Sequence, residues 1–308
     1  MDLSKERFLI QTAESIGISA AARETGIAKE NLRNWERRYG FPQPVRDING
    51  ERTYPVGQVE KLRVVRRLMD AGYRPGNILR KNVDELRELA LDRGPAIPQG
   101  SRFGAELDIL VSAIRDGDIR LLRTRLRWQL ATLGMREFVM GLVADLNRAV
   151  GESWARGEIL VSGEHLYSEQ IETVLRAATA QSLVEPIGPK VLLTTLPGEQ
   201  HKIGLLMLEA ILAMERAECL PLGTQTPISD IVKAATAGNA DIVALSFSAA
   251  HPAKAALEGL AELRASLPPQ TAIWAGGDGV KGIRKRPSGV KAPVTLESAV
   301  SELARWRN

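Results

Sequence analysis

The last third of the chain alternates short apolar runs with stretches in which apolar residues recur at helical spacing. Apolar runs at 190–195, 240–248 and 271–277 have the length and aliphatic content of buried strands. Helical patterns at about 202–216 and 253–266 follow the first two runs. Strands that alternate with helices predict a Rossmann-like, doubly wound parallel sheet, whose functional loops lie at the carboxyl ends of the strands.

The middle of the chain, from 103 to about 183, shows helical spacing throughout and contains few glycines or prolines. One clear run is Leu107, Leu110, Val111 and Ile114, and a second is Phe138, Leu142, Leu146 and Val150. Several helices with short connections predict a helical bundle. The proline- and glycine-containing stretch 93–100 before it is interpreted as a linker.

Near the N-terminus, two short helical segments at 20–24 and 28–39 flank a Thr-Gly-Ile turn, in which Gly26 permits the tight bend. Leu32 and Trp35 share one face of the second segment, so that its arginine and amide side chains face outward. Such a helix reads bases and binds phosphates in the major groove. A charged, solvated surface helix is the alternative interpretation.

A hairpin signal, Asn-Gly within 42–54, and a basic amphipathic helix from Val56 follow. In this order, Trp35-Glu-Arg-Arg-Tyr-Gly, Arg52-Thr-Tyr54 and Leu68-Met-Asp-Ala-Gly-Tyr resemble the MerR family's winged helix-turn-helix, over residues 10 to about 85. The resemblance implies binding of double-stranded operator DNA as an oligomer at paired half-sites. The residues it places at the DNA are Asn31, Arg33, Arg37, Arg38, Arg46, Arg52 and Tyr54.

Small and polar residues follow each of the three predicted strands. The loop 197–204 holds Glu199, His201 and Gly204, and the next two strands end in Ser-Phe-Ser at 246–248 and in Gly-Gly at 276–277. The carboxyl ends of parallel strands share one edge, so these residues should surround one slot. A loop histidine can offer a ring nitrogen to a ligand, and a nearby carboxylate can orient it. A surface histidine beside a helix cap is the alternative.

These residues resemble the cobalamin-binding fold of corrinoid enzymes and regulators, whose pattern is Asp-x-His-x-x-Gly, then Ser-x-Leu or Ser-x-Thr, then Gly-Gly. Glu199 replaces the aspartate here, and Ser248 is a departure in the serine motif. The resemblance implies that His201 is the lower axial cobalt ligand and displaces the dimethylbenzimidazole tail into the slot. The implied lining of that slot is Ser246, Ser248, Gly276 and Gly277.

The segment 154–165 is similar to the cap over the upper cobalamin face in the CarH and LitR photoreceptor regulators. There the equivalents of Trp154, Val161, Glu164 and His165 enclose the 5′-deoxyadenosyl group, whereas core and surface roles are the alternative. Those photoreceptors carry a cobalt-capturing histidine directly after the tryptophan, where this chain has Ala155. The resemblance therefore implies adenosylcobalamin binding but not the light-sensing mechanism. A substitute histidine could come only from His165 or His251.

The amino-acid composition indicates the class of protein and its cellular environment. The chain has 308 residues with 44% hydrophobic and 25% charged, within the range of ordinary soluble globular proteins. It has no run of about 18 apolar residues, so no membrane partner is expected. A single cysteine, Cys219, fits the reducing cytoplasm, and the N-terminus lacks a secretory signal. The net charge is +4, but residues 28–81 alone hold 13 Lys and Arg against 6 Asp and Glu. This basic block points to a polyanionic partner.

The sequence thus predicts a three-part cytoplasmic regulator: a winged helix-turn-helix at 1–92, a helical cap at 101–184 and a cobalamin domain at 187–308. We expect cobalamin to control assembly into a dimer or tetramer and hence operator binding, with light as one candidate signal. One alternative is a regulator that senses another ligand, such as haem. Another is a DNA-binding protein whose C-terminal domains only oligomerise. A corrinoid-carrying methyltransferase module is disfavoured by the DNA-binding motif, so no enzyme activity is expected.

Overall fold

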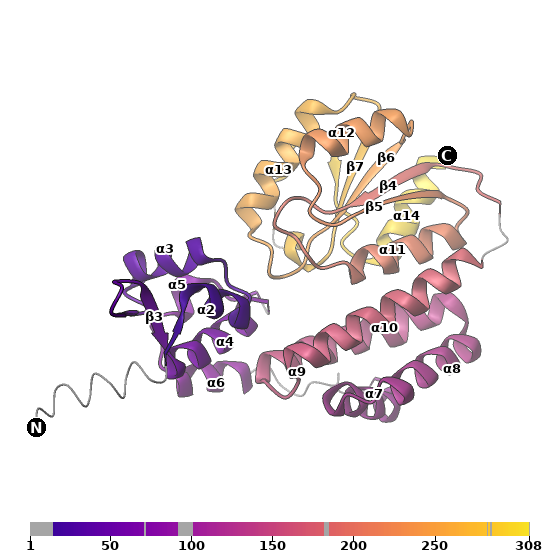
Figure 1. The fold of residues 1–308 in the computed structure, drawn as a ribbon. Helices are drawn as coiled ribbons and strands as arrows, with labels where there is room; N and C mark the ends of the chain where they lie inside the picture. Colours follow the sequence, from indigo (N-terminus) through magenta and orange to yellow (C-terminus); the bar gives the residue numbers. More distant parts are fainter. Residues whose placement is uncertain are drawn as a thin grey trace, which may run out of the picture. The chain divides into compact units, whose positions relative to one another are not determined.

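The computed structural model describes residues 15–70, 72–91, 101–181, 185–281, 283 and 285–307 (Figure 1). The chain divides into two compact units. One consists of Met1–Gly94 together with Glu152–Glu158, and the other of Pro95–Gly151 together with Ile159–Asn308. The linker predicted at 93–100 lies outside the described residues.

The N-terminal unit has a small antiparallel sheet in the order β1-β3-β2, surrounded by short helices. Its elements are β1 (Ser15–Gly17), α2 (Ile18–Thr25), α3 (Lys29–Tyr39), β2 (Val45–Arg46), β3 (Arg52–Pro55), α4 (Val56–Asp70), α5 (Pro75–Ile78) and α6 (Val83–Leu91). Gly26 ends α2 at φ +66°, a left-handed conformation that glycine adopts without steric cost. Leu32, Trp35 and Leu62 are buried in one core. The predicted helix-turn-helix, hairpin and following helix are confirmed.

The second unit begins with a helical bundle, as predicted. Its helices are α7 (Gly104–Asp116), α8 (Ile119–Glu137), a π-helical continuation at Phe138–Val143, α9 (Ala144–Arg156) and α10 (Val161–Ala180). Leu110, Leu142 and Ile171 are fully buried in its core. Met207 and Ala210 from a helix of the following α/β part join the same core, so the bundle and the sheet region of this unit pack as one body.

The α/β part is a five-stranded parallel sheet in the order β5-β4-β6-β7-β8. Its strands are β4 (Lys190–Thr194), β5 (Glu218–Gly223), β6 (Ile242–Ser246), β7 (Ala272–Gly276) and β8 (Val290–Lys291). Its helices are α11 (Ile203–Met214), α12 (Ile228–Ala237), α13 (Ala253–Ser266) and α14 (Leu296–Arg307), with a 3₁₀ turn at Asp278–Val280. The predicted doubly wound, Rossmann-like sheet is confirmed.

The order of the strands decides where a ligand site can form. Helices α11 and α14 cover one face of the sheet, and α12 and α13 cover the other (Figure 1). The chain leaves β4 towards β5 on one side and returns to add β6 on the other side. The loops after β4 and β6 therefore diverge at a topological switch point, where open α/β sheets bind ligands.

We predict that Gly277→Ala destabilises this unit. Gly277 has φ +92°, and an added Cβ would lie 2.4 Å from the carbonyl oxygen of Phe247. The strained backbone should cost about 1–3 kcal/mol in the free energy of unfolding, measured by urea denaturation. Gly104→Ala is the matched control, because no atom lies within 4 Å of its added Cβ. Equal stabilities of the two variants would contradict this account.

Candidate functional site

His201 lies in the loop between β4 and α11, next to a buried carboxylate. Its Nδ1 is 2.6 Å from Oε1 of Glu199, and the same oxygen accepts a hydrogen bond from the His201 backbone N–H at 2.9 Å. The His201 side chain is 46% exposed, whereas that of Glu199 is 1% exposed. A carboxylate bound to Nδ1 places the proton there in the neutral ring and leaves the lone pair on Nε2, the form that binds a metal.

The second oxygen of Glu199 joins this loop to the next one. Oε2 accepts hydrogen bonds from the backbone N–H and the hydroxyl of Ser248, both at 2.8 Å. Burial alone would raise the pKa of Glu199, but the hydrogen bonds from His201 and Ser248 outweigh it and hold the pKa at about 2. Glu199 is therefore ionised at neutral pH and binds the loops after β4 and β6 together.

A second histidine lies behind this carboxylate. His251 has a side chain that is 2% exposed, and its Nδ1 is 3.9 Å from Oε2 of Glu199. Neither ring nitrogen of His251 has a hydrogen-bond partner among the residues that the structure describes. Burial lowers its pKa, although the Glu199 charge opposes this effect. His251 is thus a buried neighbour of the Glu199 network and not an exposed ligand.

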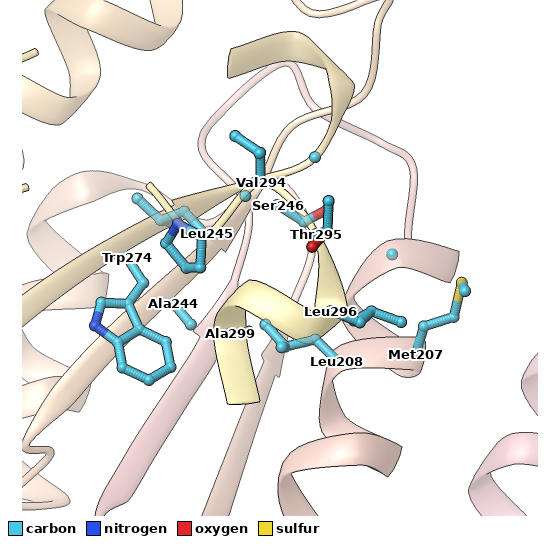
Figure 2. A pocket seen from close by; sticks show the side chains of 14 residues that line it. Met207, Leu208, Ala244, Leu245, Ser246, Trp274, Val294, Thr295, Leu296 and Ala299 are labelled. Carbon is cyan, nitrogen blue, oxygen red and sulfur yellow. The ribbon is translucent and has the colours of Figure 1, made fainter. Parts of the chain in front are cut away.

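A hollow opens at Gly204, three residues after His201, between α11, α14 and the carboxyl ends of β6 and β7 (Figure 2). Gly204, Ser246, Gly276 and Gly277 all line it, as predicted for a slot at this edge. A Cβ at Gly204 would lie 2.6 Å from Oγ of Ser246, and one at Gly276 would lie 2.9 Å from the Pro293 carbonyl oxygen. Larger residues at these two positions would therefore crowd the slot.

The prediction that Ser248 lines this slot is wrong. Ser248 is absent from the lining, because both its backbone N–H and its hydroxyl point to Glu199. The structure instead adds apolar residues that the motif did not indicate, including Leu208, Trp274 and Ala299. Ala299 belongs to α14, nearly a hundred residues after the histidine loop, and no local pattern connects the two.

The four residues expected above the ligand divide between the two units. Trp154 belongs to the N-terminal unit, where its indole N–H donates to Asp70 Oδ2 at 3.3 Å and the Arg67 guanidinium lies 5.3 Å from its ring centre. The other three lie in the first turns of α10 in the second unit: Val161, Glu164 and His165. Glu164 accepts hydrogen bonds from His165 and Ser168, and Ala155 is buried.

In the N-terminal unit, α3 presents a polar outer face. The residues exposed on it are Asn31, Arg33, Asn34, Arg37 and Arg38, whereas Leu32 and Trp35 are buried. The Arg37 guanidinium donates to Oδ1 of Asn34 at 2.8 Å. An outward face of arginine and amide groups on the second helix of a helix-turn-helix is suited to a DNA groove.

The hairpin residues behave differently from one another. Arg46 is exposed and donates to the Gly50 carbonyl at 2.7 Å. Arg52 is half-buried in an ion pair with Glu36 at 2.9 Å, and this hydrogen bond raises its pKa. The prediction that Tyr54 contacts DNA is corrected: its side chain is fully buried in the core of the unit, with no hydroxyl partner among the described residues.

These features define a class: a DNA-binding regulator with a ligand-binding α/β module. The family described as MerR HTH family regulatory protein matches residues 17–81, and B12 binding domain families match residues 106–179 and 189–290. None of the described helices has the length and apolar character needed to cross a membrane.

Two curated relatives place the chain further. HTH-type transcriptional repressor CarH of Myxococcus xanthus is 30% identical over 84% of this chain and 88% of its own length. HTH-type transcriptional repressor CarA of the same organism is 30% identical over 76% of each chain. The chain therefore belongs to the family of MerR-type transcriptional regulators with B12-binding domains that includes CarH and CarA. A cobalamin-binding protein from Desulfitobacterium hafniense is 20% identical over 65% of this chain and 98% of its own, with a TM-score of 0.34.

We predict that Ser248→Ala destabilises the unliganded protein. The variant loses one hydrogen bond to a buried charged group, which should cost about 1.5–3 kcal/mol at pH 7 in urea denaturation. Ser229→Ala, at an exposed position of α12, is the matched control and should be neutral.

The difference in the free energy of unfolding between wild type and Ser248→Ala should become smaller as the pH falls. The pKa of Glu199 is lowered from 4.5 to about 2 by folding, so its stabilisation is complete above pH 4.5 and is lost as the pH falls towards 2. The gap between wild type and variant should narrow over that range. A gap that widens on acidification would refute the role of Ser248.

Proposed function

We propose that this regulator binds a cobalamin, adenosylcobalamin in particular, and that the bound cobalamin controls its assembly and its affinity for operator DNA. The observation that carries the proposal is the His201–Glu199 pair in the loop that leads to Gly204, where small residues keep a slot open. The donor chemistry suits cobalt, because a neutral imidazole oriented by a carboxylate is a strong nitrogen ligand. The slot has a volume of about 130 Å³.

In this proposal each residue of the site has a separate task. His201 would bind cobalt through Nε2, while Glu199 and Ser248 orient the imidazole. Gly204, Ser246, Gly276 and Gly277 would line the slot for the cofactor's lower tail, and Trp154, Val161, Glu164 and His165 would lie on its upper side. A bound cobalamin would supply a cobalt centre that a protein nitrogen can bind and, when it carries an alkyl group, a light-cleavable cobalt–carbon bond.

Control of DNA binding requires that the cofactor prefers one assembly state, because a ligand with equal affinity for two states shifts neither. What supports such coupling is the position of Trp154. This residue, proposed for the upper side of the cofactor, contacts Arg67 and Asp70 of α4 in the DNA-binding unit. We therefore propose a homo-oligomer, a dimer or tetramer, whose assembly changes with the state of the cofactor. Its relatives are repressors, and we propose a cytoplasmic, non-enzymatic regulator here too.

We predict that His201→Ala abolishes firm cobalamin retention. The full chain is incubated with adenosylcobalamin in the dark and desalted, and its absorbance spectrum is recorded before and after illumination. Wild type should retain a corrinoid in the form in which a protein histidine replaces the tail base, and His201→Ala should retain more than about tenfold less. Gln200→Ala, at the exposed neighbouring position, is the control.

The same experiment separates the other interpretations. Equal retention by wild type and His201→Ala, or retention by neither, would contradict the cobalamin proposal. A Soret band after incubation with haem would favour a haem sensor. A spectral change on illumination would show a light response without a histidine at position 155, where Ala155 is buried.

We predict that Arg33→Ala weakens DNA binding. Arg33 is exposed on the outer face of α3, so its loss should remove one phosphate or base contact. The slope of log affinity against log salt concentration should fall by about 1, measured by fluorescence anisotropy on a duplex of mixed sequence. Lys233→Ala, an exposed lysine of α12 in the other unit, is the control. Unchanged affinity and slope in Arg33→Ala would exclude this face as the DNA contact.

A further inference from the structure

The slot that Gly204 lines, three residues after His201, has an apolar interior. Strands β6 and β7 are paired so that Ala244 lies opposite Trp274 and Ser246 lies opposite Gly276. Because side chains alternate along a strand, these four residues face the same side of the sheet. Ala244 and Trp274 are 1% and 2% exposed, and Ala299 of α14, 2% exposed, closes the slot from the other side (Figure 2).

Two of the residues that line the slot, Ser246 and Thr295, carry hydroxyl groups. Ser246 is at the carboxyl end of β6, with its hydroxyl next to Gly204. The Thr295 hydroxyl, just before α14, already accepts a hydrogen bond from the Ser298 N–H at 3.2 Å. In Figure 2 the indole nitrogen of Trp274 lies on the side of the ring away from Leu208 and Ala299. The lining side chains of the interior therefore offer few hydrogen bonds to a ligand.

We propose that this slot selects cobamides whose lower base is an apolar benzimidazole and discriminates against cobamides with a purine base. This inference rests on the proposed cobalamin function and specifies which chemical class of lower base the slot accepts. Dimethylbenzimidazole carries two methyl groups on the edge remote from its nucleotide. Adenine carries an exocyclic amine and ring nitrogens on its six-membered ring, and these groups would lose water without gaining side-chain partners between Ala244, Trp274 and Ala299.

The test compares two ligands that differ only in the tail. Binding of hydroxocobalamin and of the hydroxo form of the adenine-containing cobamide to the full chain is measured by isothermal titration calorimetry. Both carry the same corrin ring and cobalt, and adenine, the weaker base, leaves cobalt more easily than dimethylbenzimidazole, so displacement of the tail by His201 does not itself disfavour the adenine form. We expect the adenine form to bind about 10- to 100-fold more weakly, the cost of burying unpaired polar groups. Equal affinities would overturn the inference and leave the proposed function standing.

A variant tests whether the slot itself makes the distinction. Leu208 lines the slot from α11, and Leu208→Asn would supply an amide donor and acceptor at similar volume. The preference for the benzimidazole form should shrink by about fivefold, the effect of one hydrogen bond. Leu222→Asn, at an exposed position of β5 outside the slot, should leave the preference unchanged. An unchanged preference in Leu208→Asn would overturn the assignment to this slot.

A tail-free ligand separates this inference from the proposed function. Cobinamide lacks the lower base, so it should bind more weakly than hydroxocobalamin if the slot holds the tail. Cobinamide binding as tight as that of hydroxocobalamin would overturn the inference alone. Binding of none of the three corrinoids would overturn the proposed function, and the inference with it.

Discussion

The ligand site depends on one buried charge, the carboxylate of Glu199. A carboxylate that is 1% exposed is stable only when its oxygens are paired, and His201 and Ser248 each contribute a backbone and a side-chain group. These four contacts join the loops after β4 and β6 at the point where the strand order reverses. The same carboxylate thus sets the orientation of His201 and holds the edge of the sheet on which the slot opens.

The site has a polar region at the ends of strands β6 and β7 and an apolar region two residues earlier on the same strands. The carboxyl ends of β6 and β7 carry Ser246 and Gly276, which leave room and a hydroxyl group next to Gly204. Two residues earlier, Ala244 and Trp274 make the same face apolar and buried. A ligand that fits both the His201 loop and the apolar slot needs a centre that binds an imidazole nitrogen and an apolar extension. A cobalamin whose tail is displaced from cobalt has both.

The basic charge of the N-terminal unit is only partly available to DNA. Arg52 forms an ion pair with Glu36. Arg67 is partly buried, and this burial lowers the pKa of its guanidinium. Three exposed arginines, Arg33, Arg37 and Arg38, lie on α3, and Arg46 of the hairpin is exposed as well. Arg67 also lies over the ring of Trp154, so part of the basic block of α4 packs within this unit.

Periodicity and motif order by themselves determined the helix-turn-helix, the helical bundle, strands β4, β6 and β7, and the position of Glu199 beside His201, because these features depend on neighbours along the chain. Tertiary structure alone decided the burial of Tyr54 and the bond between Ser248 and Glu199, since each depends on an element distant in sequence. The edge strand β5, half-exposed and interrupted by Pro221, has no clear pattern, and Ala299 reaches the slot only because α14 packs on α11. Local spacing shows which residues share a face, but only packing shows what that face meets.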